Sequence, residues 1–591
     1  MTQVGRAGPG RLFPPQVLRE YAFLGDGYRG ALIGPRGDVG WLCSPVWDSA
    51  PAFANLVGGA GLYGVTPEVP FVWGGYYEPG SLIWRSRWTA AGARVECREA
   101  LASPSDPHRL VLLRRVEPVD GSLPVEVVLQ VARGLGREVH QLRRDEGGAW
   151  VVDSGSRRIR WTGAADAVVD RDGVLTLHLE VPEGSRHDLV LEISDRALPA
   201  VPDPSALWRA TEEHWASAVP DFESSAAPRD ARHAYAVLRG LTAPGGGMVA
   251  AATVGMPERA EAGRNYDYRY VWLRDQAYAG LAVGVERPDP LLDEAVAVST
   301  ARILEHGPDL APAYRLDGRP LPHERRVDLR GYPGGCVVTG NWVRGQFQLD
   351  TYGELLQLYA TAGRHDHLSA DDLKAVAQLV DLVDKRWDVP DAGVWELHDA
   401  WWTQSRLACV AGLRVAARDI QSCDTARAVA LADRILADAS GRALAADGSW
   451  RRAPDLRGVD ASLLLPPVRG ALPPDDPRSR ATLRVVASEL VEDGYVYRYT
   501  TDEAPLGTTE GAFLMCGFVM CLAQLAAGDT TEAFRWFERQ RAACGPPGLL
   551  SEEFDVRQRQ LRGNLPQGFV HALLLECAQR LAATNQGTSA A

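Results

Sequence analysis

The chain has no apolar segment that could cross a lipid bilayer. No stretch of its 591 residues reaches the run of about eighteen apolar residues from which a membrane-spanning helix is inferred. Residues 1–16 also lack the apolar core, about seven residues or longer, of a secretory signal. We therefore expect neither a membrane partner nor secretion, and we expect the chain to be cytoplasmic.

Basic clusters and paired cysteines are missing as well. The formal net charge is −13, and neither Lys nor Arg gathers into a stripe, which argues against nucleic acid as a partner. The nine cysteines are scattered and odd in number, so they predict reduced thiols rather than a disulfide framework. The spacing of Cys and His predicts no metal site. The sequence leaves a homo-oligomer open.

Three common motifs of enzyme chemistry are also absent. The sequence contains no phosphate-binding GxxxxGK[ST], no zinc-binding HExxH and no GxSxG around a serine nucleophile. Nucleotide hydrolysis, zinc-dependent peptide hydrolysis and serine-dependent ester hydrolysis are therefore disfavoured.

The residue pattern divides the chain near residue 196. Upstream, short apolar runs such as 125–131 and 174–181 alternate with turn residues, which is typical of an antiparallel β-sandwich. Downstream, Ala, Leu and Val recur at helical spacing. The predicted parts are a β-sandwich domain at 1–196, a linker with a helix at 197–229, a helical domain at 230–585 and a tail at 586–591.

The helical domain shows a long series of amphipathic segments. Helices are expected near residues 230–242, 275–285, 290–306, 347–363, 370–387, 403–418, 424–438, 479–491, 510–527, 530–544 and 566–584, with a weaker one near 459–465. Such a series fits a barrel of helical hairpins and also an irregular helical domain, and the number of helices alone does not decide between them.

Residues 264–275 combine four aromatic rings with three arginines and two aspartates. Aromatic faces stack on the C–H face of a sugar, and Asp and Arg form bidentate hydrogen bonds with its hydroxyls. The segment therefore predicts a pocket for a small polar ring. A helix start with amphipathic residues at a domain edge is the ordinary alternative.

Two glutamates stand between predicted helices. Glu396 follows Trp395, and Glu552 lies within residues 548–555. Cleavage of a glycosidic bond needs two carboxyls, one to protonate the leaving oxygen and one to activate water or attack the sugar. The alternatives are a first-turn carboxylate at a helix N-terminus for Glu396 and, for Glu552, a capping partner of Ser551 or an exposed acid.

Further polar and aromatic residues lie near these glutamates in the sequence. Asn564 and Gln567 precede the last predicted helix, where they would bind a ligand or serve as cap and turn residues. Trp402 follows Glu396 closely, so it would stack on a sugar at the pocket mouth or pack between helices. Trp395 would limit the access of water to Glu396.

Together these motifs resemble family 15 of the glycoside hydrolases, the group of bacterial glucoamylases, glucodextranases and trehalases. The resemblance extends over nearly the whole chain and is far more specific than any single motif. It is carried, in order, by residues 24–34, 40–49, 264–275, 340–341, 348–354, 394–396, 510–513, 550–555 and 563–567.

The resemblance implies an N-terminal β-supersandwich, a linker helix and a C-terminal (α/α)6 barrel. It also implies inverting, exo-acting hydrolysis of an α-glucoside of the glucoamylase or glucodextranase type, with release of β-glucose. A trehalase with the same machinery is a close alternative. An inverting phosphorylase and a sugar-binding protein without catalysis are more distant ones.

The resemblance also suggests roles for single residues. Glu396 looks like the general acid and Glu552 like the general base, with carboxyls roughly 6.5–9.5 Å apart. The remaining candidate site residues are Arg274 and Asp275 as the pair that holds the first glucose, Tyr268 and Trp272 as its aromatic walls, and Trp395, Trp402, Asn564 and Gln567 around them.

The implied partner is an oligosaccharide or disaccharide of α-glucose, and the chemistry needs no cofactor. Some relatives of the trehalase type depend on phosphate and magnesium, so these two enter as an alternative. The chain has Tyr266 where the family often has Trp, and Val338 where it often has a basic residue. Such changes affect the subsites beyond the first glucose and leave the choice of substrate open.

Overall fold

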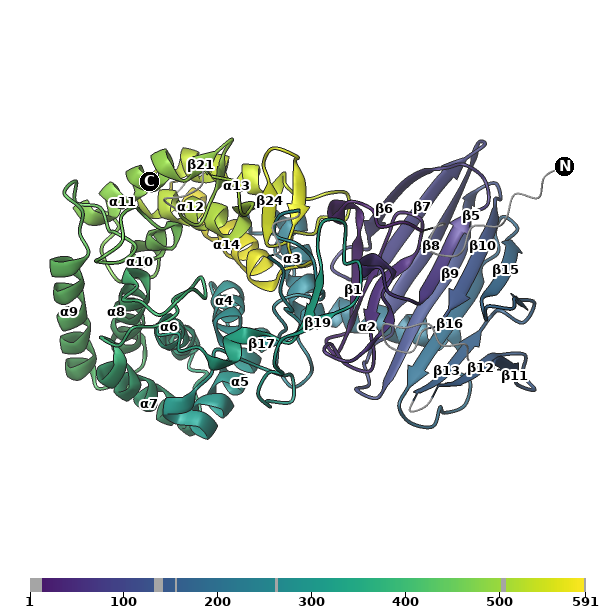
Figure 1. The fold of residues 1–591 in the computed structure, drawn as a ribbon, viewed down its shortest axis with the longest axis horizontal. Helices are drawn as coiled ribbons and strands as arrows, with labels where there is room; N and C mark the ends of the chain where they lie inside the picture. The colour runs from purple at the N-terminus through teal and green to yellow at the C-terminus, as the bar shows by residue number, and fades with distance from the viewer. Residues whose placement is uncertain (1–12, 132–141, 155–156, 261–263, 501–505, 589–591) are drawn as a thin grey trace.

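The computed structural model describes residues 13–131, 142–154, 157–260, 264–500 and 506–588. Figure 1 shows antiparallel sheets at one end of the molecule and a ring of helices at the other. Residues 1–12, and with them most of the segment that was analysed for a secretory signal, lie outside the described part. None of the described helices is long and apolar enough to span a membrane.

The N-terminal part consists of three antiparallel sheets. The first has the order β1 (Ala22–Gly25), β2 (Gly30–Ile33), β3 (Val39–Cys43), β4 (Pro51–Phe53). The second has the order β14 (Val168–Val169), β15 (Leu175–Glu180), β10 (Pro124–Gln130), β5 (Leu62–Pro67). The third has the order β11 (Leu142–Arg144), β12 (Trp150–Ser154), β13 (Arg157–Thr162), β16 (His187–Ser194), β9 (Arg109–Asp120), β8 (Ala93–Leu101), β7 (Trp84–Ala90), β6 (Val72–Tyr77).

All three sheets bury side chains in one core. Leu24 of the first sheet, Val127 of the second and Trp88 of the third belong to the same cluster of buried residues. Along β7 buried and more exposed residues alternate, as expected for a strand with one face on the core. Trp84 and Trp88 both lie on the buried face. The predicted antiparallel β-domain is therefore confirmed.

Helix α2 (Pro204–Ala218) joins the sheets to the helical part. Asp203 caps its N-terminus by accepting hydrogen bonds from the first-turn amides. The ring of Trp208 lies against the largest sheet, under the guanidinium groups of Arg98 and Arg115, and its Nε1 donates to Asp188. The helix is thus packed on the sheet.

Six inner helices form a closed ring. Their order is α4 (Leu273–Val283), α6 (Asp350–Arg364), α8 (Thr403–Asp419), α10 (Leu465–Val468), α12 (Leu514–Ala526) and α14 (Gly568–Thr588). Each contacts the next, and α14 contacts α4 and closes the ring. Residues 514–523 of α12 are buried without exception, as expected for a helix that is apolar on every side.

Six outer helices surround this ring. They are α3 (Pro228–Leu241), α5 (Pro290–His306), α7 (Ala370–Arg386), α9 (Thr425–Arg442), α11 (Pro477–Glu489) and α13 (Thr530–Arg541). In α9 the buried residues recur at helical spacing along one face. The closed double ring confirms the (α/α)6 barrel. The weak segment near 459–465 corresponds to a 3-10 turn followed by the short α10.

Short strands shape the loops at the barrel ends. They are the pairs β17 (Val271–Trp272) with β18 (Ala313–Tyr314), β19 (Arg325–Val327) with β20 (Val337–Thr339) and β21 (Val491–Glu492) with β22 (Tyr495–Val496), and the set β23 (Ala512–Phe513), β24 (Glu553–Asp555), β25 (Gln560–Arg562). The helix expected from residue 510 therefore begins only at Leu514, because 512–513 pair with β24. At the other end of the barrel sequence, α14 continues to Thr588 and includes part of the predicted tail.

Helices α6 and α8 approach each other through glycines. A Cβ atom on Gly353 would lie 2.3 Å from the backbone oxygen of Ala408, and one on Gly412 would lie 2.3 Å from the backbone oxygen of Gly353. Contacts this short do not occur between real atoms, so any side chain would push the two helices apart.

We therefore expect Gly353→Ala to lower the melting temperature, with a loss of roughly 1–3 kcal/mol in the free energy of unfolding. Gly441→Ala in α9 is the matched control, because, apart from its chain neighbours and the backbone of its own helix, no described atom lies within 4 Å of the added Cβ. This control should be neutral or stabilising by about 0.5–1 kcal/mol. Equal melting temperatures for the two variants in calorimetry would refute the close packing.

Candidate active site

A cavity of about 300 Å³ opens at one end of the helical barrel. It is lined by segments that precede the inner helices α4, α6, α8, α12 and α14 and by first-turn residues of α4, α12 and α14. Both predicted glutamates line it, together with six of the other predicted residues: Tyr268, Trp272, Arg274, Asp275, Trp395 and Gln567. Ring closure therefore brings together residues that are almost three hundred positions apart.

Glu396 lies in a tight loop with an unusual backbone conformation. Its φ is 56°, in the left-handed region that non-glycine residues rarely adopt and that concentrates at functional sites. Its Oε1 accepts hydrogen bonds from Trp272 Nε1 at 2.8 Å and from Arg274 Nη2 at 2.9 Å. The carboxyl is thus held by the aromatic and basic residues of the 264–275 segment.

Two buried acids anchor this loop from behind. Asp391 accepts from the backbone amide of Gly393 at 3.0 Å and forms a fully buried ion pair with Arg406 of α8. Asp460 accepts from Trp395 Nε1 at 2.8 Å. These buried contacts fix the position of the loop, as a precisely arranged site requires.

Glu552 contacts the other ring of the same aromatic segment. Its Oε1 accepts from the hydroxyl of Tyr268 at 2.8 Å, and its Oε2 is buried without a donor among the described residues. Burial and the nearby charge of Glu258 raise the pKa of Glu552 to about 8, while Arg498 and the Tyr268 hydrogen bond act in the lowering direction.

The neighbouring Glu553 faces away from the cavity. Its Oε2 accepts from the backbone amide of Gly511 at 2.7 Å, and its Oε1 lies 3.6 Å from Arg498 Nη2. Glu553 is the first residue of β24, and successive strand side chains point to opposite faces. Glu552, which precedes the strand, lines the cavity, and Glu553 does not.

The aromatic rings connect the two glutamates. Tyr268 and Trp272 meet edge to face with ring centroids 5.5 Å apart, and Tyr266 stacks on Tyr268 at 6.0 Å. Tyr268 holds Glu552, and Trp272 holds Glu396. One aromatic pair thus sets where both carboxyls lie.

Several buried oxygens at the cavity have no donor within the described residues. They are Oδ1 of Asp275, Oε1 of Gln567 and Oε2 of Glu552. Buried acceptors are normally satisfied, so this wall suits a ligand that carries several hydroxyl groups. Burial, opposed by Arg274, raises the pKa of Asp275 to about 7, and the charge of Glu396 acts in the same raising direction.

Two of the predicted residues do not line the cavity. Trp402 is 4% exposed, donates to the carbonyl of His398 and packs against Gly393. Asn564 lies behind the wall, where it donates to the carbonyl of Tyr266 at 2.9 Å and accepts from Thr253 at 2.8 Å. Closeness in the sequence did not determine which way these side chains point, and both pack within the protein.

Three charged residues of the cavity wall were not predicted as site residues. They are Glu258, Arg264 and Arg498. Arg264 belongs to the 264–275 segment and could have been chosen there. Glu258 and Arg498 carry no local signal, because only the barrel brings their segments to the cavity.

Comparisons with known proteins agree with this geometry. Residues 231–579 match the family model for glycosyl hydrolases family 15, and residues 14–194 match the trehalase-like N-terminal domain. A trehalase of Mycobacterium tuberculosis is 30% identical, over 95% of this chain and 89% of its own. A trehalase of Mycolicibacterium smegmatis is 30% identical, over 96% of this chain and 92% of its own.

A bacterial glucoamylase solved in complex with acarbose has the same fold. Its TM-score is 0.69 at 14% identity, with 96% of this chain and 95% of the other covered. The double ring of helices, the sheets before it and the matches over both parts lead to one conclusion. The chain belongs to glycosyl hydrolases family 15 and is a glycoside hydrolase.

Proposed function

We propose that the protein is an inverting α-glucoside hydrolase in which Glu396 is the general acid and Glu552 the general base. The observation that carries this proposal is the placement of both carboxyls on one cavity, each held by one ring of the Tyr268–Trp272 pair. Inversion requires a separation of roughly 6.5–9.5 Å so that a water fits beside the sugar. That separation stays a prediction.

The proposed reaction consists of one displacement. Glu396 donates a proton to the glycosidic oxygen while the bond from that oxygen to the anomeric carbon breaks. Glu552 accepts a proton from the water that attacks the anomeric carbon on the opposite face. Arg274 and Asp275 would bind hydroxyls of the terminal glucose. The two carboxyls exchange all protons of the reaction, so the proposal includes no cofactor.

The assignment of Glu396 as acid and Glu552 as base rests on their positions in the family motifs, and not on the charges around them. Arg274 Nη2 lies 2.9 Å from Glu396 Oε1. The raised pKa of Glu552 would leave a base protonated at low pH. The proposed base works only when ionised, so activity should be lost as the pH falls through the pKa of Glu552.

We propose trehalose as the substrate. The two mycobacterial trehalases cover nearly the whole chain, and the cavity of about 300 Å³ is at the small end of the range for ligand sites. An exo-hydrolase of maltose-like or dextran-like ends is the second candidate. It is favoured by Trp342, which lines the cavity and is 44% exposed, because an exposed ring could support a longer chain.

The first prediction from the proposed function concerns substrate and stereochemistry. Proton NMR of a fresh reaction on trehalose should show α- and β-glucose in equal amounts, because inversion changes only the attacked unit. Maltose, isomaltose and dextran should be cleaved more slowly. Release of α-glucose alone would contradict inversion, and glucose 1-phosphate formed with added phosphate would indicate a phosphorylase.

The second prediction separates acid from base. Glu396→Gln should lower kcat/KM on trehalose by about a hundredfold or more, with a much smaller loss on α-glucosyl fluoride, whose leaving group needs no proton. Added azide should restore activity to the Glu552→Ala variant, with β-glucosyl azide as the product.

Glu553→Gln is the matched control for the base, because Glu553 faces away from the cavity. Azide should not rescue this variant. Azide rescue of a Glu396 variant in place of the Glu552 variant would show that the two roles are reversed.

The third prediction concerns the hydroxyl of Tyr268. It donates to Glu552 and favours the ionised carboxyl, so Tyr268→Phe should raise the pKa of Glu552. The acid limb of the kcat/KM profile should move to higher pH by about one unit. Tyr266→Phe, which removes a hydroxyl from the ring stacked on Tyr268, should leave the limb in place. An unmoved limb in Tyr268→Phe would contradict Glu552 as the base.

A further inference from the structure

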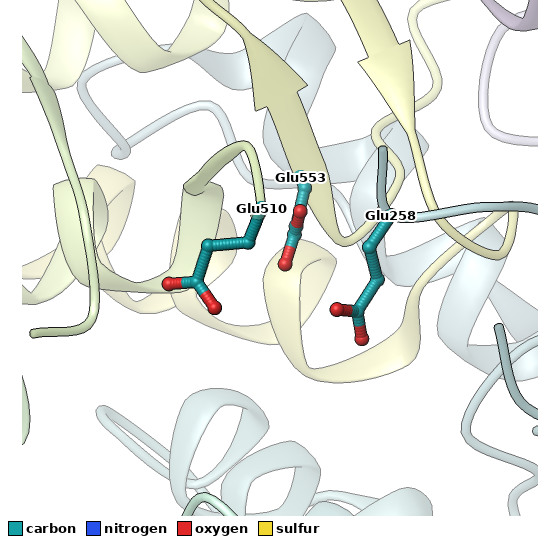
Figure 2. Close-up of side chains that lie close together, drawn as sticks. All are labelled: Glu258, Glu510 and Glu553. Atoms are coloured by element: carbon teal, nitrogen blue, oxygen red, sulfur yellow. The ribbon is translucent and has the colours of Figure 1, made fainter. Parts of the chain in front are cut away.

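Three glutamates from separate segments meet beside the cavity (Figure 2). Glu258 lies in the loop after α3, Glu510 just before β23, and Glu553 on β24. One carboxylate oxygen of each lies within 4.8 Å of the others, and all three residues are buried. Glu258 also lines the cavity that contains Glu552. A buried cluster of this kind needs nearby positive charge or bound protons, and burial raises the pKa of Glu258 and of Glu553.

Two arginines supply that compensation. Arg498 Nη2 bonds to Oε2 of Glu510 and lies 3.6 Å from Glu258 and 3.6 Å from Glu553. Arg264 lies 3.1 Å from Glu258 and 3.0 Å from Glu510. A single nitrogen of Arg498 therefore lies near oxygens of all three glutamates.

The cluster does not fit a magnesium ion. Magnesium requires nearly octahedral oxygen ligands at about 2.0–2.1 Å and retains several waters. Here the guanidinium of Arg498 lies where the ion would have to lie, and Arg264 adds a second positive group. Each carboxylate has an arginine nitrogen within ion-pair distance, although one oxygen of each has no hydrogen-bond partner among the described residues. A divalent ion between the three would have to displace Arg498.

Arg498 also contacts both loops that carry the candidate catalytic residues. Its guanidinium lies over Phe513 with 4.9 Å to the ring centroid and over Trp395 with 5.7 Å. Trp395 precedes Glu396 in the sequence, and Glu553 follows Glu552. One side chain thus bridges the immediate neighbours of the two glutamates.

We propose that Arg498 takes the place of a metal ion in the Glu258–Glu510–Glu553 cluster and acts as a positioning residue for Glu396 and Glu552. This inference rests on the proposed function for its catalytic consequence. Arg498 holds the two loops by ion pairs and ring contacts, and its charge partly offsets the acidic cluster next to the base.

The electrostatic consequence has a definite sign. Glu258 raises the pKa of Glu552, and Arg498 lowers it. Loss of the positive charge should therefore move the acid limb of activity to higher pH, and loss of the Glu258 charge should move it to lower pH. The titratable and charged groups that act most strongly on the pKa of Glu552 are Glu258, Arg498, Tyr268 and Glu396, and the charge of Glu552 raises the pKa of the neighbouring Glu553.

The experiment compares pH profiles of kcat and kcat/KM on trehalose or the best α-glucoside. Arg498→Met should lower kcat at least tenfold and move the acid limb upward by about one pH unit. Arg498→Lys keeps the charge but loses the planar group. Its acid limb should lie at the wild-type pH, while its kcat should stay low. Glu258→Gln should move the limb downward.

Arg469→Met is the matched control, because Arg469 forms a buried ion pair with Glu576 and does not line the cavity. It should lower the melting temperature without moving the limb. If Arg498→Met does not fold, two results still test the proposal: a limb that moves downward in Glu258→Gln, and a lowered kcat with an unmoved limb in Arg498→Lys. Limbs that stay in place in all of the folded Arg498 and Glu258 variants would overturn it.

Metal binding provides a readout that does not depend on activity. Calorimetric titration with magnesium chloride should give the same result for the wild type and for Glu510→Gln. Binding in the wild type that Glu510→Gln abolishes would overturn the assignment of Arg498. If the wild type cleaves no α-glucoside, the proposed function fails, while this titration and NMR titration of Glu552 in the Glu258→Gln variant still test the cluster.

Discussion

The contact between Tyr268 and Trp272 determines where the two cavity glutamates lie. Each ring carries one polar atom, and each polar atom donates to a different carboxyl. Because the rings meet edge to face, neither can turn without disturbing its neighbour. Rigid aromatic groups lose little entropy when they are ordered, so this pair is an economical way to hold two charges at a set distance.

Buried charge is the second constraint, and it is distributed around the cavity. Arg406 and Arg498 pair with buried acids, and Arg274 pairs with the partly buried Glu396, in the loops that carry the site. Buried ion pairs contribute little net stability, because desolvation offsets their attraction. Removal of one partner is costly, however, and these pairs therefore serve to specify the geometry of loops that have no regular structure of their own.

Much of the fold was readable from the sequence. Helical periodicity located most of the barrel helices within a few residues, and the aromatic and charged segment 264–275 identified one wall of the cavity. Strands β6, β7 and β8 were not identified, since their alternation includes arginines that pair across the sheet and weaken the apolar pattern. The helix predicted from residue 510 begins later, because strand pairing with β24 competes for its first residues.

The sequence by itself determined the class of the fold, the family resemblance and the two glutamates, because these depend on local residue types and their order. Only the tertiary structure decided that Glu552 rather than Glu553 faces the cavity and that Trp402 and Asn564 pack away from it. It also brought Glu258 and Arg498 to the same wall. Side-chain direction and the meeting of distant segments follow from the closure of the helical ring, which no local pattern encodes.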